Sequence, residues 1–517
     1  MNFKRTIAGI SALCLVGAVS FTAGMAASPK GTNAAANLFG DINGDEKIDA
    51  KDASVILSYY SYLSTTSENV MSLEEFMING RNTQPETPDR EVKLKTGGDK
   101  FTVVAWNADD APTLIANWLG LDPVTIMDEL ADDHIEGVNL VVLGTSGSMA
   151  SERYDEMFNS GADMDVYFSE PNWALKYLND DSRSAPLSDV GITLDDTKDM
   201  YPYTVEQCKD SNGVLKAAAW YAAPGCFAYR ADFAEKYLDV KNPEEMQAAI
   251  GNWDDFVSAA QTISRKTLGE FALADTVNGM WTAYSHGRSA AYVKDGTINI
   301  DDDVKDFADK AKTLWDCSGV TKNSQWTDEW IDAGRTGACM GYFVSSWGLD
   351  GFFVEAAGGV NGETYGKWAV CEGPAPYYWG GTMMLVNPAT DNAEEARDFI
   401  LASAFNKDNL KKYASQLTNP VLPNSMTVSA SLAEDNFTYS QTISQNFGGQ
   451  NYFAVLDKNA RTIDLTGKIT PYDDAIEADI IYGLYNDYIS KGIKGKSLEQ
   501  TLTDIKKKIQ TDCPSLK

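Results

Sequence analysis

An oxygen-rich loop near the start of the chain, residues 41–52, has the composition of a site for a hard cation. Oxygen-bearing side chains occupy loop positions 1, 3, 5, 9 and 12, a backbone carbonyl is available at position 7, and apolar Ile48 stands at position 8. Ca²⁺ prefers such a cage of carboxylate, amide and carbonyl oxygens. We therefore expect Ca²⁺ as a cofactor. Its expected ligands are Asp41, Asn43, Asp45, Lys47 (through its carbonyl), Asp49 and Asp52.

The segment after this loop has the spacing of a half-buried helix, with apolar residues from Val55 to Leu63. The loop and helix, residues 40–64, resemble the calcium-binding repeat of a dockerin, a module that docks on the cohesins of scaffold proteins. Two features depart from that pattern, because Glu46 stands where glycine is usual and no second loop is found. The resemblance implies a small α-helical, EF-hand-like segment over 38–79 and a cohesin-bearing scaffold as a partner. Because a dockerin normally has two repeats, three interpretations of this segment stay open: a half-dockerin, a degenerate dockerin and a calcium-stapled structural cap.

The rest of the chain alternates strand and helix patterns. Apolar strand patterns occur at 101–106, 138–143 and 165–169. Helical patterns recur at 151–158, 232–238, 253–264, 302–315, 394–404, 472–489 and 497–510. Such alternation is typical of a parallel sheet in an α/β fold. We expect one large α/β module over 98–517, preceded by a polar, proline-bearing linker over 80–97.

Aromatic and polar residues follow the first and third of these strands. Ligands of α/β sheets lie beyond the carboxyl ends of the strands. The residues expected there are Trp106, Asn107, Asp109, Asp110 and Glu170. A structural role competes with this interpretation, because Asp109 and Asp110 also suit the cap of a helix that starts near Pro112. Glu170, beside Pro171, also suits the start of a helix.

Several aromatic- and glycine-rich segments of the large module stand apart from the regular patterns. They are Tyr201–Val205, Ala219–Arg230, Gln325–Trp330, Trp368–Thr382 and Phe447–Phe453. Together these segments resemble the extracellular solute-binding proteins, family 1, of carbohydrate ABC importers. The resemblance implies a type II periplasmic-binding-protein-like fold, in which two α/β lobes close by a hinge on a ligand between them. Residues 218–225 and 376–384 look like two of the crossing segments.

The resemblance also implies a set of ligand-binding residues. Sugars need flat aromatic rings against the apolar faces of pyranoses, and carboxylates and amides for their hydroxyls. Matched to this sequence, the ligand-binding residues are Trp106, Asn107, Asp109, Glu170, Trp220, Trp347, Trp379 and Asn451. A tryptophan in or beside a strand can equally belong to the core, and Gly380-Gly381 can be a tight bend as well as a hinge. The implied partners are an oligosaccharide and an ABC permease, and the chain is expected to be a monomer.

Charge and composition exclude several other functions. The chain of 517 residues has 43 Lys and Arg against 74 Asp and Glu, a net charge of −31 that repels phosphate backbones and excludes nucleic-acid binding. The only histidines, His134 and His286, cannot build a multi-histidine zinc site, and both are expected to be ordinary polar residues. The seven cysteines form no C-x-x-C pair. Cys339 and Cys371 are the pair that we would test first for a disulfide.

The N-terminus has the features of an export signal. Lys4 and Arg5 precede an apolar run from Ile7 to Val19, followed by small residues that suit a signal peptidase. We expect a signal peptide over 1–27 and a secreted, cell-surface-associated protein. An uncleaved membrane anchor is the alternative.

Three functions follow from these observations. The leading hypothesis is an extracellular oligosaccharide-binding protein that is no enzyme, delivers sugar to an ABC importer and is tethered through the dockerin-like module. The alternative is a secreted, dockerin-bearing glycoside hydrolase that acts through paired carboxylates. A purely structural scaffold component, with no small ligand, is the third.

Overall fold

The structure is a computed structural model that describes residues 90–517, apart from 124, 132–134, 146, 350, 417–420 and 435–440. The expected signal peptide, the calcium loop with its helix, most of the linker and His134 lie outside the described residues. Among the residues described, no helix combines the length and apolar character needed to cross a membrane.

The first lobe is built on a five-stranded sheet of order β2-β1-β3-β11-β4. Its strands are β1 (Phe101–Ala105), β2 (Val138–Val142), β3 (Val166–Ser169), β4 (Ala217–Ala219) and β11 (Met383–Val386). The strands β2, β1 and β3 run parallel, as the alternating pattern predicts. The complete sheet is mixed, because β11 pairs antiparallel with both β3 and β4.

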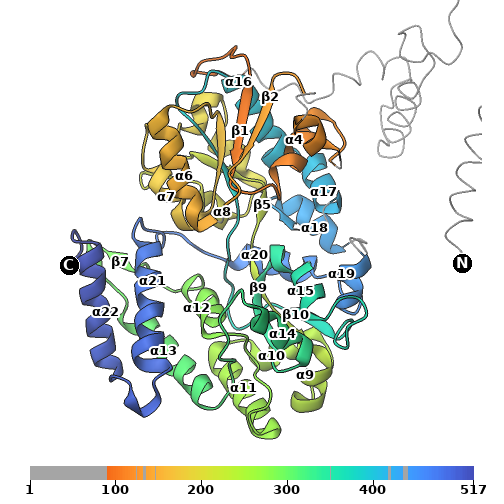
Figure 1. The fold of residues 1–517 in the computed structure, drawn as a ribbon, viewed down its shortest axis with the longest axis vertical. Helices are drawn as coiled ribbons and strands as arrows, with labels where there is room; N and C mark the ends of the chain where they lie inside the picture. Colours follow the sequence, from red (N-terminus) through yellow and green to blue (C-terminus); the bar gives the residue numbers. More distant parts are fainter. Residues whose placement is uncertain are drawn as a thin grey trace, which may run out of the picture. The chain divides into compact units, whose positions relative to one another are not determined.

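Helices cover both faces of this sheet, which is why β1 and β3 are mostly apolar and are buried along their whole length. They are α4 (Ala111–Leu119), α5 (Ile126–Ala131), α6 (Gly147–Ser160), α7 (Pro171–Leu178), α8 (Pro202–Gln207), α16 (Ala393–Ile400) and α17 (Lys407–Gln416), with a π-helical segment, η6 (Leu401–Phe405). Figure 1 shows α6 and α7 on one side of β1 and β2, and α4 and α17 on the other.

The second lobe has an antiparallel sheet of order β10-β6-β9. Its strands are β6 (Gly225–Arg230), β9 (Gly341–Ser345) and β10 (Trp368–Cys371). Around it lie α9 (Ala231–Leu238), α10 (Pro243–Ile250), α11 (Trp253–Thr267), α12 (Val277–Ser285), α13 (Asp301–Asp316), α14 (Asp328–Thr336), α15 (Gly351–Ala356), α18 (Met426–Glu434), α19 (Gln441–Asn446), α20 (Phe453–Thr462), α21 (Asp473–Gly483) with the π-helical η7 (Leu484–Ile489), and α22 (Leu498–Asp512). The two-lobed α/β architecture is thereby confirmed.

Two connections join the lobes where the sequence predicts them. The chain leaves the first sheet after β4 and enters the second at β6, and it returns between β10 and β11. In this first connection, β5 (Tyr221–Ala222) pairs with β12 (Leu422–Pro423). β12 lies between α17 and α18 along the chain, so the chain passes from the first lobe to the second once more there. A second short ladder, β7 (Val293–Lys294) with β8 (Thr297–Ile298), lies in the second lobe.

The last residues of the expected linker, 90–97, are held on the first lobe. Both terminal nitrogens of Arg90 bind the carboxylate of Asp196, at 2.9 and 2.6 Å, and the Lys93 amide donates to the Asp189 carbonyl at 2.7 Å. Fixed backbone bonds and a bidentate ion pair are features of a folded module, so residues 90–97 belong to the same compact unit, Arg90–Lys517, as the large module.

The suggested disulfide between Cys339 and Cys371 is wrong. All six described cysteines are free. Cys371 ends β10 and Cys339 precedes β9, and these two strands lie on opposite sides of β6. Two strand spacings of about 4.8 Å put their backbones farther apart than a disulfide can span.

Candidate functional site

A cavity of about 690 Å³ opens between the two lobes and their connections. Its size suits a small organic ligand, since such sites commonly measure about 300–1,000 Å³. Its lining is rich in indole rings and carboxylates. The lining residues are Trp106, Asn107, Asp109, Asp110, Ser151, Glu170, Asn172, Trp173, Tyr221, Trp326, Trp347, Trp379, Gly380, Gly381, Thr382, Val421 and Asp474.

Three tryptophans form the wall that the second lobe contributes. The rings of Trp326 and Trp347 are stacked, with centroids 5.9 Å apart and an interplanar angle of 28°. Trp379 meets both edge-on, with centroid distances of 5.8 and 5.5 Å. The Trp347 Nε1 donates to the Trp379 carbonyl at 2.8 Å, which fixes the orientation of its indole. These rings together offer a flat, apolar and pre-ordered surface.

The first lobe contributes two further indoles. Trp106 directly follows β1, and Trp173 lies in the first turn of α7. Their ring centroids are 6.1 Å apart in an edge-on arrangement with an interplanar angle of 74°. Tyr154 packs behind Trp173 at 6.0 Å and donates to the Val104 carbonyl at 3.2 Å, so the pair is anchored to the sheet.

The loop after β1 places carboxylates beside these rings. Asn107 Nδ2 donates to Asp109 Oδ2 at 2.5 Å. Asp110 accepts a hydrogen bond from the Tyr413 hydroxyl of α17. Burial raises the pKa of Asp110 to about 6, the Tyr413 bond opposes that rise and the nearby Asp109 charge adds to it. Asp110 also occupies the cap position of α4 but makes no side-chain cap bond there.

Glu170 occupies a similar place after β3. It precedes Pro171, the first residue of α7, and its side chain makes no cap bond, so its carboxyl group is available to the cavity. Burial raises the pKa of Glu170 from 4.5 to about 7, although the Trp173 side chain opposes the shift. A sugar hydroxyl would find a carboxyl group here that is poorly hydrated and ready to form a hydrogen bond.

The raised pKa of Glu170 predicts how stability depends on pH. Between about pH 4.5 and 7 the unfolded chain releases the Glu170 proton and the folded chain keeps it, so the free energy of unfolding should fall as pH rises. Each pKa unit corresponds to about 1.4 kcal/mol. Glu170→Gln should flatten this slope, be more stable than the parent above pH 7, and leave the curve below pH 4.5 unchanged. Urea unfolding across this pH range measures the effect, and parallel curves for the two proteins would contradict it.

The second connection needs glycine at the cavity. Gly380 and Gly381 have φ angles of +71° and +109°, which side chains rarely adopt. A Cβ on Gly380 would lie 3.4 Å from Trp347 Nε1. Because of these angles, the chain can turn tightly past the indole, and the adjacent Thr382 Oγ1 lies 3.2 Å from the Tyr221 hydroxyl.

Comparison with known proteins identifies the chain. The model of the bacterial extracellular solute-binding protein family matches residues 125–438, more than half of the chain. The chain belongs to this family. It is therefore a binding protein of an extracellular family and not an enzyme.

Solved structures share the fold of this solute-binding protein at low sequence identity. An extracellular solute-binding protein of family 1 is 17% identical, with a TM-score of 0.66 over 80% of this chain and 99% of that chain. The ABC-transporter-associated binding protein of B. animalis subsp. lactis Bl-04, in complex with β-1,6-galactobiose, is 20% identical, with a TM-score of 0.58 over 81% and 99%. The galacto-N-biose/lacto-N-biose I-binding protein of Bifidobacterium longum is 18% identical, with a TM-score of 0.58 over 80% and 97%. Among curated proteins there is no match. The expected two-lobed, periplasmic-binding-protein-like fold is thus confirmed.

The structure of this solute-binding protein brings most of the expected ligand-binding residues together. Six of them line the cavity between the lobes. They are Trp106, Asn107, Asp109, Glu170, Trp347 and Trp379.

Two expected residues lie elsewhere. Trp220 is 0% exposed in the core of the first lobe, where its Nε1 donates to the Tyr413 hydroxyl at 3.3 Å, so its ring cannot stack on a ligand. It supports Asp110 indirectly, because Tyr413 donates onward to that carboxylate. Asn451 lines a separate cavity in the second lobe and donates to the Leu432 carbonyl at 2.8 Å.

Sequence reasoning missed several residues that line the cavity, among them Trp173, Tyr221, Trp326 and Asp474. Some of these residues had a signal in the sequence. Trp326 belongs to the Gln325–Trp330 segment of the family resemblance, and Trp173 lies three residues, about one helical turn, after the expected Glu170. Asp474 carries no such signal. It enters the cavity because α21, far along the chain, packs against the second lobe.

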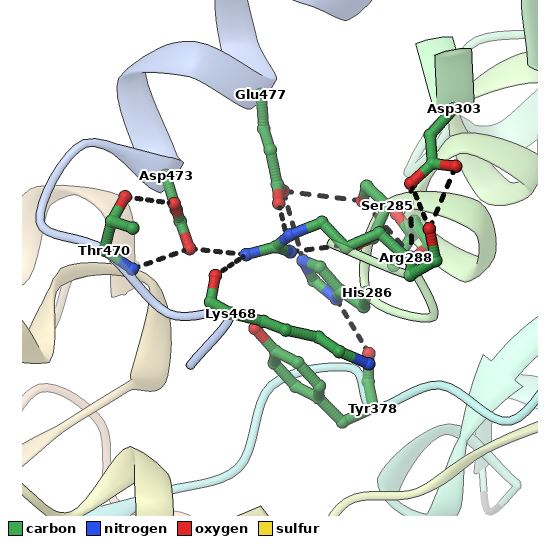
Figure 2. Close-up of polar contacts among 11 residues, drawn as sticks. Ser285, His286, Arg288, Asp303, Tyr378, Lys468, Thr470, Asp473 and Glu477 are labelled. Atoms are coloured by element: carbon green, nitrogen blue, oxygen red, sulfur yellow. Dashed lines mark hydrogen bonds and ion pairs between the residues drawn. The ribbon is translucent and has the colours of Figure 1, made fainter. Parts of the chain in front are cut away.

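A buried ionic network holds α21 in place (Figure 2). Arg288 donates to Asp473 Oδ2 at 2.5 Å, to Glu477 Oε1 at 3.2 Å and to the Lys468 carbonyl at 2.9 Å. Burial raises the pKa of Asp473 against the pull of Arg288, whereas the pKa of Glu477 is lowered because the attraction of His286 and Arg288 outweighs its burial.

His286 links this network to the cavity. Its ring stacks on Tyr378 with centroids 4.4 Å apart and an angle of 4°, while its Nε2 lies 3.2 Å from Glu477. The interpretation of His286 as an ordinary, satisfied polar residue is confirmed. Because Tyr378 directly precedes Trp379, the network positions both α21 and the connection that carries this indole.

Proposed function

We propose that this protein captures an oligosaccharide between its lobes and delivers it, unchanged, to an ABC importer. The observation that carries the proposal is the lining of the cavity. Indoles lie on both lobes, Trp106 and Trp173 on one and Trp326, Trp347 and Trp379 on the other, and carboxylates line the same cavity. Aromatic rings suit the C–H faces of pyranoses, and carboxylates accept hydrogen bonds from their hydroxyls.

Closure of the lobes follows from the contribution of indoles to the site by both lobes. A sugar that contacts both sets of indoles binds the closed state more tightly than the open one, and this difference in affinity would drive the hinge motion. The glycine pair at 380–381 lies within a connection and beside Trp347, so the turn that leads to the indoles is also a point where the backbone can rotate.

Two of the structural relatives support the choice of ligand and partner. They are described as binding proteins of ABC transporters, one in complex with β-1,6-galactobiose and the other with lacto-N-biose. An importer delivers its ligand intact, which separates this proposal from the glycoside hydrolase alternative.

Calorimetric titration with a panel of α- and β-linked oligosaccharides tests the proposal, with mass spectrometry of the sugar afterwards. We expect one sugar per chain and no change in its mass. Shortened sugar would favour the hydrolase, and the lack of any heat across the panel would reject the carbohydrate assignment.

We further propose that the N-terminal segments export and tether the protein. The sequence of residues 1–27 supports export, and the ligand pattern of 41–52 supports a calcium site that docks on a cohesin-bearing scaffold.

The calcium site predicts a specific loss of metal binding. The full chain should bind one Ca²⁺, and replacing Asp45 and Asp49 with alanine should weaken that binding about tenfold or more, because two oxygen ligands are lost. Calorimetry with Ca²⁺ measures this, and Asp195→Ala, at an exposed carboxylate of the large module, serves as the control. Equal Ca²⁺ affinity of the parent and the double variant would contradict the calcium site. A cohesin that binds the parent chain equally well with and without a calcium chelator would contradict the proposed tether.

A further inference from the structure

A second, smaller cavity of about 360 Å³ lies on the second lobe, and we refer to it as the outer groove. It is formed by the start of α12, the end of α13, the loop after it and the α21–η7 helix. The described residues that line it include no carboxylate, but its three aromatic rings and three amides are also groups that suit a sugar. They are Trp315, Tyr482, Tyr485, Asn278, Asn323 and Asn486.

One face of α21 joins the outer groove to the main cavity. Asp474 lines the main cavity, and Ala478, Ile481, Tyr482 and Tyr485 line the outer groove. Asp474, Ala478 and Tyr482 follow one another at spacings of four residues, and Ile481 and Tyr485 lie three residues after Ala478 and Tyr482, so these side chains share one helical stripe. At about 1.5 Å per residue, the stripe runs on the order of 12 Å from Asp474 to Tyr482. The helix therefore forms a common wall for both spaces.

The loop after α13 forms a second common wall. Asn323 and Ser324 line the outer groove, and Trp326, two residues later, lines the main cavity. Trp326 has a φ angle of +66° and is 59% exposed, so its backbone is held in an uncommon conformation that presents the indole to the cavity. The two spaces thus adjoin along two elements.

The outer groove keeps its polar and aromatic groups available. Tyr482 is 73% exposed, although the neighbouring Ile480 and Leu484 are fully buried. Asn323 and Asn486 each donate one hydrogen bond to a backbone carbonyl, at 2.9 and 3.0 Å. Within the described residues, their Oδ1 atoms accept no hydrogen bond. An exposed ring beside amide oxygens suits sugar hydroxyls and C–H faces.

The face of α21 beside this stripe keeps the wall in place. Asp473 and Glu477, each one residue before a member of the stripe, bind the buried Arg288 (Figure 2). The position of Tyr482 is therefore set by the same network that positions Asp474. The stripe is pre-ordered, which lowers the entropic cost of binding a ligand along it.

We infer that the outer groove is an additional subsite for the same ligand, occupied by the sugar units of a longer oligosaccharide that extends from the main cavity along α21. The inference rests on the proposed function, because the first units of the chain bind between the lobes. It adds that the preferred ligand is longer than a disaccharide.

Affinity as a function of sugar length tests this inference. The probes are gluco-oligosaccharides from disaccharide to hexasaccharide with α-1,4 or β-1,4 links, and β-1,6-linked galacto-oligosaccharides of the same lengths. The proteins are the parent, Tyr482→Ala, Ala478→Trp, which places bulk at the junction of the two spaces, and the control Tyr488→Ala. Tyr488 lies in the same π-helical segment but bonds Asp309, and it does not line the groove.

The parent should bind a longer member of one series about tenfold more tightly than its disaccharide, the gain expected of one aromatic contact. Tyr482→Ala and Ala478→Trp should each remove this gain and leave the disaccharide affinity unchanged, whereas Tyr488→Ala should retain the gain. Equal affinity of the parent for all lengths of a series that it binds, or a gain that survives both groove variants, would overturn the outer subsite and leave the proposed function intact. A parent that binds no member of any series would overturn the proposed function, and the subsite with it.

Discussion

Replacing Arg288 with methionine is expected to lower the free energy of unfolding by about 3–5 kcal/mol. The guanidinium group is almost fully buried, at 5% exposure, and it is the cation that faces both Asp473 and Glu477. Without it, two acidic groups remain in a poorly hydrated position and repel each other. The cost of an unpaired buried charge greatly exceeds that of losing an exposed ion pair.

Urea unfolding at neutral pH measures this effect. Arg335→Met is a matched control, because Arg335 also pairs with a carboxylate, that of Asp332, but on the surface, and its loss should cost less than about 1 kcal/mol. Adding Glu477→Gln to Arg288→Met should restore part of the lost stability by removing one unpaired charge. A loss for Arg288→Met as small as that for Arg335→Met would show that the network does not stabilise the second lobe.

Replacing Trp347 with alanine is expected to weaken sugar binding by about a hundredfold or more, the effect of removing a central aromatic contact. Its indole stacks on Trp326 and donates to the Trp379 carbonyl, so its loss also frees the other two rings of that wall. The surface that remains would be smaller and less ordered.

Calorimetry with the sugar identified in the panel measures this loss. Trp118→Phe is the control, because Trp118 packs edge-on against Phe101 and Phe399 in the first lobe, away from the cavity. Both variants should fold, as judged by circular dichroism. If the affinity of Trp347→Ala stayed within about threefold of the parent, the indole wall could not be the main platform for the sugar.

Local patterns predicted the elements of the fold well and their pairing less well. The strand patterns at 101–106, 138–143 and 165–169 and all seven helical patterns correspond to elements of the structure, because each pattern reports which local residues face a core. The direction of β11 was not predictable in this way. Its apolar residues suit a parallel or an antiparallel strand equally, and the choice depends on the path of the chain from the second lobe.

The residues of the candidate site were likewise predictable only in part. Trp106, Asn107, Asp109 and Glu170 were found because the carboxyl ends of neighbouring parallel strands meet at one edge. Trp220 and Trp379 both lie in connections between lobes, yet only Trp379 reaches the cavity. Sequence does not show to which side of such a connection a ring turns. That choice is made by the packing of Phe168 and Tyr221 around Trp220.

The place of β11 in the first sheet has a consequence for how the chain folds. β11 lies between β3 and β4, although it is synthesised long after both and after all three strands of the second sheet. Until Met383–Val386 emerge, β4 has no partner in the sheet, and the backbone groups along one edge of β3 are open. Contacts between residues so far apart in the sequence slow folding. They also leave a strand edge exposed to aggregation until β11 has been synthesised. A nascent chain of this protein would therefore benefit from a chaperone until its second half is complete.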